Sequence, residues 1–583
     1  MNDVYIGASS LITALGRGVK VNADAVENCL SGVTLHESAD FSSGPLYAAS
    51  IPESVYREAV SEYGELPRAE LLLSAVVGDV LKESGTDLSD PETMLVISTT
   101  KGDVELLDPS DSMPDGRTYL WKTGENVARR FGAGDRFIVI SNACISGVSA
   151  MIVAMRLVSS GRCRRAVVAG CDVLSRFVVS GFSSFKSLSS GRCRPYDASR
   201  DGLNLGEAAG AVVLGCGPED GQVVISGGSI SDDANHISGP SRTGDGLFFA
   251  MRDAMREAGV TPDEISFMEL HGTATVYNDE MESKAIALAG MSPVPVQSLK
   301  PYFGHTLGAS GVIETIMSIE QMKRGVVWGT PGFVTMGVPE PVNVSAEHRK
   351  CRMRHCLKAA SGFGGCNAAI VLSLPEYVTD REDRWSLSRN SATEAEVLRT
   401  VEISDGRILR NGHEVFSSKE QDFGDFAREA YRASGRTYMK FFKMDNLCKL
   451  GYLAAEELLD GIGFEPLETA LVLSNSSSSL DSDLRHLEEV ALHGEQGASP
   501  AVFVYTLPNV VSGEICIRHR IKGENTFFIT REYAPGKLRG YASMIMSGCG
   551  YRYCIAGWCE MLKGRYMARF ELLGPGTISG NEV

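Results

Sequence analysis

The sequence lacks several features that mark membrane, exported or nucleic-acid-binding proteins. It has no apolar run long enough to span a bilayer, and its first residues, MNDVYIGASS, lack the basic start and cleavage site of a signal peptide. Positive charge is also scarce, because 56 lysines and arginines stand against 73 aspartates and glutamates, a formal net charge of −17. This balance argues against nucleic acid and anionic membranes as main partners, and we expect a cytoplasmic protein.

No CxxC pair occurs among the 14 cysteines. The nearest approaches to a cluster are CRMRHC, with Cys351 and Cys356, and CGYRYCIAGWC, from Cys549 to Cys559. Their spacing suits neither a zinc finger nor an iron–sulfur site, so we expect no metal. Reduced, mostly buried thiols are the simplest interpretation of every cysteine except Cys144.

What is present is enough apolar material for more than one core, since 43% of the 583 residues are hydrophobic. Up to about Leu374, near-continuous apolar runs such as MLVIS, FIVIS and NAAIVLS alternate with helical stretches such as AELLLSAVVGDVLKESG. Such runs are typical of strands buried on both faces. Their alternation with helices predicts an α/β protein with layered sheets.

A later region of the chain repeats the front half of the earlier one. PETMLVISTTKGDVELLD resembles LETALVLSNSSSSLDSDL, and GDRFIVISNACISG is echoed by GENTFFITREYAPG, which has Tyr533 and Ala534 in place of Cys144. Duplication of half a domain explains one long separation better than a solenoid does. We predict a first domain, a polar linker and a half-copy without the nucleophile, over residues 1–374, 375–425 and 426–583.

Cys144 stands at the corner between an apolar strand and a small-residue helix start, in FIVISNACISGVSA. ELHGTATVYNDEMES contains His271, SLKPYFGHTLGASGVIE contains Lys300 and His305, and SGFGGCNAAIVL places three glycines around Phe363. A cysteine at a helix start lies at the positive end of the helix dipole, which is expected to lower its pKa. Together these residues predict nucleophilic catalysis rather than packing.

These stretches, in this order, resemble the β-ketoacyl synthases, the condensing enzymes of fatty-acid and polyketide synthesis. The resemblance covers about the first two thirds of the chain and includes the opening VYIGASSLITALGRG and the stretch CRPYDASRDGLNLGEAAG. It implies the thiolase-like fold, in which two similar halves stack as five αβαβα layers. The second domain would then be an α/β domain that resembles half of that fold.

The resemblance also implies a reaction, the decarboxylative Claisen condensation of an acyl thioester with malonyl-acyl carrier protein. Cys144 would hold the acyl chain, and His271 and His305 would assist the loss of carbon dioxide and the enolate that follows. Lys300 would set the local field and help to position His305, with Glu314 as its partner.

Further residues are assigned to substrate by the same resemblance. The backbone N–H groups of Cys144 and Phe363 would form the oxyanion hole, and Phe363 would also be the gate that admits the malonyl group. Thr273, Thr275 and Phe182 would contact the substrate, the two threonines through its pantetheine arm.

The implied partner is an acyl carrier protein, which brings its own phosphopantetheine arm, so no resident cofactor is expected. Lys186 stands where a docking contact for that partner would lie, and Arg162 could extend a basic patch around it. The chain would form a homodimer, or a heterodimer with another condensing-enzyme-like subunit.

Other interpretations fit the residues less well. A thiolase acting on coenzyme A esters would use a second cysteine near the C-terminal motif, and a cysteine hydrolase would give no reason for Lys300 or a second histidine. The non-enzymatic alternative is a chain-length-determining or scaffolding subunit, which fits the second domain better because it lacks the thiol. For that domain, because NTFFITRE resembles RFIVISNA without the thiol, we hypothesise that the half-copy acts as a pseudo-dimer partner, a docking platform or a stabilising cover. Chain length, primer and pathway (fatty acid, polyene or polyketide) remain open.

Overall fold

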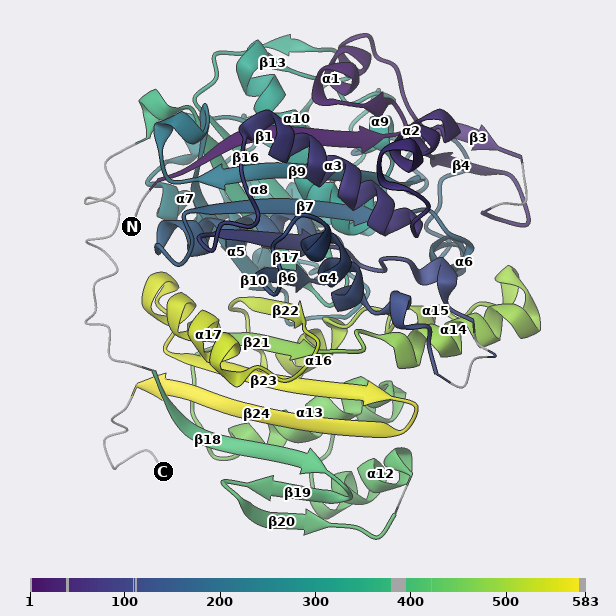
Figure 1. Cartoon of the computed structure of the whole chain (residues 1–583), viewed down its shortest axis with the longest axis vertical. Helices are drawn as coiled ribbons and strands as arrows, with labels where there is room; N and C mark the ends of the chain where they lie inside the picture. Colours follow the sequence, from purple (N-terminus) through teal and green to yellow (C-terminus); the bar gives the residue numbers. More distant parts are fainter. Residues whose placement is uncertain are drawn as a thin grey trace.

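The computed structural model describes residues 3–37, 41–108, 110, 113–378, 395–420 and 422–575. Within these ranges the chain forms two stacked bodies, one above the other in Figure 1, each built around a sheet whose strands run across the view. No helix of the described ranges is both long enough and apolar enough to span a bilayer.

The upper body contains two sheets. In the first sheet the strand order is β1-β9-β7-β5-β6, with β5 parallel to both of its neighbours and the β7–β9 and β1–β9 pairs antiparallel. Its strands are β1 (Val4–Thr13), β5 (Thr93–Ser98), β6 (Phe137–Ile140), β7 (Arg165–Asp172) and β9 (Ala208–Gly215). Because the strands are buried on both faces, they are the near-continuous apolar runs of the sequence.

The second sheet of the upper body has the order β10-β17-β16-β11-β12-β14. Its strands are β10 (Val223–Asp232), β11 (Ile265–Glu269), β12 (Pro295–Gln297), β14 (Asn343–Val344), β16 (His355–Gly362) and β17 (Cys366–Ser373). β1 and β10 also pair, so the two sheets are linked at one edge.

Two helices, α5 (Ser146–Ser159) and α10 (Ser310–Arg324), fill the layer between the sheets, and every residue of α5 is buried. The two helices touch at Gly147 and Gly311, where a Cβ on Gly147 would lie 2.9 Å from the Cα of its partner. Only glycine permits this approach. It brings together the N-terminal ends of both helices, where Cys144 and His305 lie.

Outer helices complete the five layers of the thiolase-like fold. Over the first sheet lie α2 (Glu53–Tyr63), α3 (Arg68–Ser84) and α4 (Leu120–Arg130), and over the second lie α7 (Asp245–Ala258) and α8 (Val276–Leu288). The remaining helices of this body are α1 (Val19–Glu27), α6 (Arg176–Ser184) and α9 (Lys300–Phe303), and its short strands are β2 (Gly16–Arg17), β3 (Thr34–His36), β4 (Leu46–Ala49), β8 (Leu205–Gly206), β13 (Val326–Val327) and β15 (Arg349–Lys350).

The lower body repeats the first sheet of the upper one. Its order is β18-β24-β23-β21-β22, in which the first two pairs are antiparallel and the last two parallel, as in the first sheet. The strands are β18 (Ala395–Ser404), β21 (Thr469–Asn475), β22 (Asn525–Ile529), β23 (Tyr553–Leu562) and β24 (Arg565–Pro575). α13 (Asn446–Leu459) takes the place of α3, and α17 (Pro535–Cys549) that of α5.

Its other elements are α12 (Phe423–Ala433), α14 (Leu480–His493), α15 (Pro500–Phe503), α16 (Val510–His519), β19 (Arg407–Arg410) and β20 (His413–Ser417).

The linker expected over 375–425 is too long, because strands begin at Ala395. Residues 379–394 lie outside the described ranges, but β18, β19 and β20 form an antiparallel meander that begins at Ala395 and joins β24. The sequence of this meander is polar because only one face of its strands is covered, so charged side chains alternate with apolar ones. We place the start of the second domain at this meander.

The two bodies meet at the strand that carries the nucleophile. β22 pairs antiparallel with β6, with Phe528 opposite Ile140 and Ile529 opposite Val139, so the two sheets are continuous (Figure 1). The side chain of Asn142 extends the pairing, since it donates to the carbonyl of Asn525 at 2.7 Å and accepts from the N–H of Phe527 at 2.8 Å. The strand of NTFFITRE thus pairs with the strand before the nucleophile within one chain.

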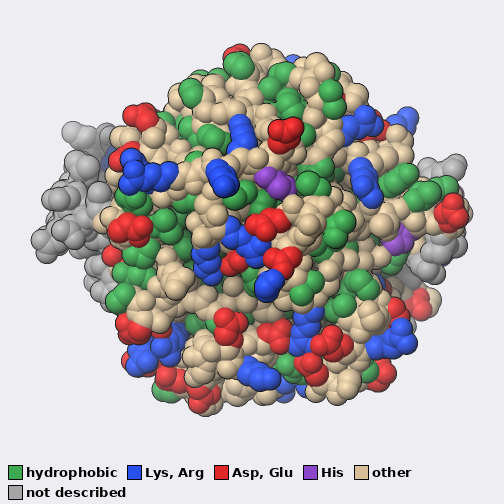
Figure 2. Space-filling view, turned by 90° about the horizontal axis from the view of Figure 1, so that it is seen from above, with side chains coloured by type: hydrophobic (Ala, Val, Ile, Leu, Met, Phe, Trp, Pro, Cys, Tyr) green, Lys and Arg blue, Asp and Glu red, His purple; other side chains and the backbone are tan. Residues whose placement is uncertain are grey.

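Charge on the face seen from above is mixed. Basic and acidic side chains stand next to one another across this face (Figure 2), so on it the net negative charge is not gathered into one patch.

Candidate active site

Cys144 lies in the short turn between β6 and α5. Ala143, just before it, has a φ of 46°, in the left-handed region that non-glycine residues rarely adopt. The turn is held by Ser146, whose hydroxyl accepts from the N–H of Asn142 at 2.8 Å and donates to the carbonyl of Ala143 at 2.6 Å. A strained, hydrogen-bonded turn fixes the thiol at the head of the helix.

Two histidines converge on this thiol. Nε2 of His305 lies 3.1 Å from Sγ of Cys144, and its Nδ1 lies 3.2 Å from the hydroxyl of Ser310. The ring of His271 stands edge-on to that of His305, with centroids 5.0 Å apart. Glu282 accepts from the backbone N–H of His271 at 2.8 Å, which anchors the turn after β11. All three reactive side chains thus share one buried space.

Burial controls the protonation of the three groups. It raises the pKa of the Cys144 thiol to about 12, so the expectation of a lowered pKa from the helix dipole is wrong for the free protein. Burial and then the nearby Lys300 hold the pKa values of His271 and His305 well below their usual range. The resting site therefore contains a neutral thiol beside a neutral imidazole that can accept its proton.

A buried ion cluster lies behind the histidines. Lys300, on α9, pairs with one oxygen of Glu314, on α10, and Lys358, on β16, pairs with the other oxygen at 2.6 Å. Lys358 is fully buried and Lys300 is 1% exposed. Burial alone would raise the pKa of Glu314, but the two lysines outweigh it and hold that pKa below its usual range. The carboxylate is thus ionised between two cations.

Cys144, His271 and His305 are also the group in the described ranges whose ligand atoms stand close enough for a metal ion, within 4.8 Å of one another. The two ammonium groups of Lys300 and Lys358 next to them would repel a divalent cation. The charge of the site therefore suits an anion that forms during a reaction better than a metal.

The glycine-rich turn between β16 and β17 closes over the thiol. A Cβ on Gly362 would lie 3.2 Å from the backbone N of Cys144, so the turn can approach only because that residue is glycine. The ring of Phe363 stacks on that of Phe182, with centroids 6.1 Å apart. Its carbonyl accepts a hydrogen bond of 2.8 Å from the side chain of Asn509, which belongs to the second domain.

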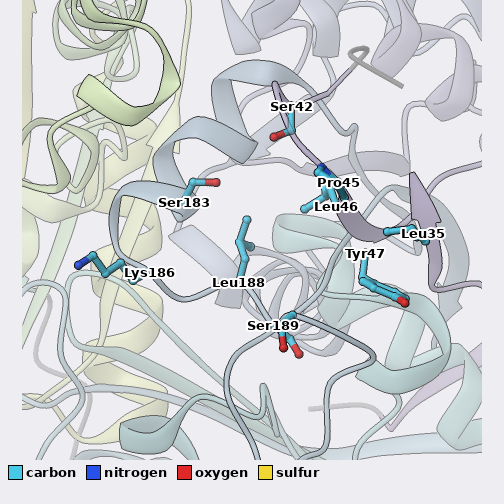
Figure 3. A pocket seen from close by; sticks show the side chains of 10 residues that line it. Leu35, Ser42, Pro45, Leu46, Tyr47, Ser183, Lys186, Leu188 and Ser189 are labelled. Atoms are coloured by element: carbon cyan, nitrogen blue, oxygen red, sulfur yellow. The ribbon is translucent and has the colours of Figure 1, made fainter. Parts of the chain in front are cut away.

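The remaining predicted residues lie apart from the thiol. The hydroxyls of Thr273 and Thr275 are 2.9 Å apart at the turn that leads into α8. Lys186 is exposed and lines a cavity of about 320 Å³ between the β3–β4 hairpin and the end of α6. Figure 3 shows its side chain directed away from the neighbouring Leu188 and Ser189.

Arg162 does not join Lys186 in one basic patch. It follows the C-terminal end of α5 and donates to the carbonyl of Gly540 in α17 at 3.0 Å. α17 and α6 stand on opposite sides of the molecule in Figure 1. The structure therefore assigns this arginine to the contact between the domains.

Several residues of the site were not predicted. Lys358 appears in the sequence only as one lysine within the apolar stretch HCLKAASGFGG, and a charge in a buried strand is the signal that could have found it. Ser310 lies five residues after His305, in the same motif, whereas Asn509 and Phe503 act through contacts between distant segments that no local pattern predicts.

In the second domain, Tyr533 and Ala534 stand between β22 and α17, where the first domain has its nucleophile turn. Only Leu538, Tyr541, Ala542, Met544 and Ile545 of α17 are buried, in contrast to all of α5.

Comparisons with known proteins agree with this architecture. Residues 49–216 match the beta-ketoacyl synthase N-terminal domain, and residues 222–333 match the beta-ketoacyl synthase C-terminal domain. A 3-oxoacyl-[acyl-carrier-protein] synthase 2 of Rhizobium meliloti is 34% identical over 276 residues, 44% of this chain and 65% of that protein. A putative polyketide beta-ketoacyl synthase 1 of Streptomyces cyaneus is 31% identical over 43% of this chain and 63% of its own length. The chain thus spans less than two thirds of these relatives.

Solved structures extend the likeness. The ketosynthase ApeO in complex with its chain length factor ApeC, from Xenorhabdus doucetiae, is 25% identical over 64% of this chain and 98% of its own, with a TM-score of 0.56. The PfaC keto synthase-chain length factor matches 100% of this chain and 79% of its own, with a TM-score of 0.76 and 13% identity. The second likeness concerns the fold alone and includes both domains.

Proposed function

Residues 49–333 of the chain belong to the β-ketoacyl synthase family, and from this premise we propose that the protein condenses an acyl thioester with malonyl-acyl carrier protein, releasing carbon dioxide. The observation that carries the proposal is the buried group of one thiol and two neutral imidazoles, with Sγ of Cys144 3.1 Å from Nε2 of His305. Each of these three side chains has a task in the reaction.

In the first half-reaction, Cys144 takes the acyl chain. Its sulfur attacks the thioester carbonyl, its proton passes to Nε2 of His305, and the carrier thiolate leaves and regains a proton. The negative charge on the carbonyl oxygen is met by the backbone N–H groups of Cys144 and Phe363, which the glycine turn brings close to the thiol. The product is an acyl-cysteine in a water-poor site.

In the second half-reaction, a malonyl thioester loses carbon dioxide, and the electron pair of the broken bond forms an enolate. His271 and His305 donate hydrogen bonds to the enolate oxygen, a task that requires neutral imidazoles and is supported by their depressed pKa values. The enolate carbon attacks the acyl carbonyl, the sulfur of Cys144 leaves, and a β-ketoacyl thioester results. Lys300 supplies a positive field throughout.

The substrates would arrive on an acyl carrier protein. Thr273 and Thr275, which face each other at the turn before α8, would bind the pantetheine arm, and Phe363 would move to admit the malonyl group. The exposed Lys186 beside its cavity is the proposed docking contact. No resident cofactor is needed, because the reactive thiol of the carrier is brought with the substrate.

For the second domain we propose a partner role instead of catalysis. β22 occupies the edge of β6 that a second copy of the chain would otherwise pair with, so we expect this edge to form a pseudo-dimer rather than a homodimer. This is also where the alternative function, a chain-length-determining or scaffolding subunit, applies. It is supported by the likeness to solved structures of a ketosynthase together with a chain length factor.

The contacts that support this role lie along an aromatic row. Phe363 stacks on Phe182, Phe182 contacts Phe503 of the second domain with centroids 5.6 Å apart, and a Cβ on Gly181 would collide with the Phe503 ring. Beyond the row, the buried Lys101 pairs with Asp483 of the second domain at 2.7 Å. We propose that an acyl chain on Cys144 extends along this row and ends at the second domain.

The proposal is tested by mixing the protein with acyl-loaded and malonyl-loaded carrier protein and measuring the β-ketoacyl product by mass spectrometry. His271→Ala should still form acyl-enzyme but should lose most of the condensation product, whereas His305→Ala, which also removes the base beside Cys144, should slow both half-reactions. Loss of acyl-enzyme in His271→Ala, with normal folding, would contradict the division of labour between the two half-reactions.

A further inference from the structure

Lys358 is an ion-pair partner of Glu314 that comes from a different element than Lys300. It lies on β16, the strand that leads to the glycine turn with Phe363, whereas Lys300 lies on α9, just before His305. Glu314 binds Lys300 through one oxygen and Lys358 through the other, the latter at 2.6 Å. One carboxylate thus joins the chain segment before His305 to the strand before Phe363.

A second buried carboxyl group faces the same lysine. Glu269 is the last residue of β11, two residues before His271, and in the parallel pairing of β11 with β16 it stands opposite Lys358. Glu269 is fully buried, one of its oxygens has no hydrogen-bond partner, and the other accepts from the N–H of Leu299 at 3.3 Å. Lys358 therefore lies between two carboxyl groups, next to both catalytic turns.

The charge count of this cluster depends on Lys358. A pair of Lys300 and Glu314 alone is neutral, so the field of the lysine would be largely cancelled at the histidines. Burial raises the pKa of Glu269 to about 8, which keeps this carboxyl group protonated at neutral pH, whereas the ionised Glu314 outweighs burial and raises the pKa of Lys358. With Lys358 present, the cluster carries one surplus positive charge.

We propose that Lys358 is a positioning residue for the condensing reaction. It fixes the second oxygen of Glu314, so that Lys300 is held in one place, and it leaves the buried cluster with a surplus positive charge beside Cys144, His271 and His305. That charge keeps both imidazoles neutral and favours each anion of the reaction, the thiolate and the enolate. The effect on the enolate rests on the proposed function, whereas the effect on the Cys144 thiolate does not.

Other charged and titratable groups face the same histidines and must stay constant in a test. They are Cys144 before α5, Asp172 at the end of β7, Glu282 on α8, Lys300 on α9, Glu314 on α10 and Glu269 on β11. Substitution of Lys358 alone leaves all of these side chains in place, so a change in pH dependence follows from the loss of this ammonium group, directly or through its two carboxyl partners.

The test compares Lys358→Met, which removes the charge at similar length, with Lys358→Arg, which keeps it. The first measurement is the pH dependence of carbon dioxide release from malonyl-loaded carrier protein. Without the positive charge the histidines protonate more easily. The pH below which activity is lost, the acid limb of the pH profile, should therefore lie about one pH unit higher in Lys358→Met. Lys358→Arg should keep the acid limb within a few tenths of the wild-type position.

The second measurement does not depend on condensation. Alkylation of Cys144 by iodoacetamide at pH 7, where Glu269 is protonated, should be about tenfold slower in Lys358→Met, because the thiolate fraction falls by the same shift of about one unit. If the wild type releases no carbon dioxide but alkylation slows as expected, the proposed function fails and the role of Lys358 stands. Unchanged alkylation and an unchanged acid limb in Lys358→Met would overturn the inference.

Arg156→Met is the matched control, because Arg156 is also a buried cation paired with a glutamate, but at the far end of α5. It should lower the melting temperature without moving the acid limb or slowing alkylation. If it shifts them as Lys358→Met does, the effect belongs to lost stability, and the positioning role of Lys358 is refuted.

Discussion

The first sheet of the upper body and the sheet of the lower body have the same strand order, yet only the first leads to the cluster of Cys144, His271 and His305. In the first, the helix after the nucleophile strand is entirely buried because a second sheet covers it. In the lower body no such sheet covers α17 among the described residues, and side chains such as Arg539 and Ser547 face solvent.

The comparison teaches which part of the fold the reaction requires. The five-stranded sheet alone provides a corner for a nucleophile, but the histidines, Lys300 and Glu314 all come from the segments after β10. Among the described residues the second copy has the sheet and its pairing edge without those segments. This agrees with the partner role proposed for it.

The largest effect is expected from the nucleophile itself. Cys144→Ala should reduce condensation at least about a thousandfold, because no acyl-enzyme can form. Ala534→Cys, which places a thiol at the matching corner of the second domain, should take up no acyl chain, because no histidine or lysine of the site lies there. Acylation of that engineered cysteine, detected by peptide mapping, would break the comparison.

The next effect concerns the contact between the two copies. Arg156 pairs with Glu524 of the second domain at 2.7 Å, and the glutamate is fully buried. Glu524→Gln leaves a buried guanidinium without its counter-charge and should reduce the free energy of unfolding by about 3–5 kcal/mol. Glu320→Gln, which removes the partner of the more exposed Lys323, is the control and should cost less than about 1 kcal/mol. Equal effects in denaturant titrations would contradict the importance of the domain contact.

A smaller, pH-dependent effect comes from His486, which lies at the same contact. Its Nε2 is 3.1 Å from the hydroxyl of Ser180, and burial lowers its pKa to about 4. At His486 the unfolded chain takes up a proton below about pH 6.5, whereas the folded protein does not until about pH 4. The contribution of this histidine to the free energy of unfolding is therefore fully present above about pH 6.5 and is lost as the pH falls toward 4.

Between pH 6.5 and 4 the free energy of unfolding should fall by roughly 2 kcal/mol more in the wild type than in His486→Gln. Denaturant titrations at the two pH values measure this difference. Parallel curves for the two proteins would show that the histidine is not held neutral at the contact.

The smallest expected effect is on product length rather than on rate. Phe503→Ala removes the second-domain ring that packs on Gly181 and Phe182, and should allow at least one further extension of the acyl chain. Phe426→Ala, a fully buried phenylalanine in the second-domain core, should lower stability without changing the product. A product of unchanged length in Phe503→Ala would remove the second domain from the proposed acyl wall.

Much of this architecture could be predicted from sequence, and the exceptions have physical causes. The apolar runs predict the buried strands of both bodies, because strands buried on both faces have an unambiguous pattern. The likeness of FFIT to FIVIS indicates a partner role for the second domain, and the structure shows it as the pairing of β22 with β6. β18 falls within the predicted linker because a strand with only one covered face leaves many of its residues partly or fully exposed, so its sequence has few apolar residues in a row.

The residues of the site divide in the same way. Cys144, His271 and His305 stand in long, ordered motifs, so their meeting could be expected. Lys358 has no motif, and its importance follows only from the distance of 2.6 Å to Glu314. The raised pKa of Cys144 was missed because a sequence shows the helix that follows a thiol but not how completely water is excluded from it.

The central claim is that Cys144 holds the acyl chain that a malonyl-derived carbon then attacks. It is tested most directly by the intact mass of the protein after addition of acyl-loaded carrier protein, and again after malonyl-loaded carrier protein. We predict an acyl adduct on the wild type and none on Cys144→Ala, followed by its discharge as a β-ketoacyl product. A β-ketoacyl product formed by Cys144→Ala would contradict the claim.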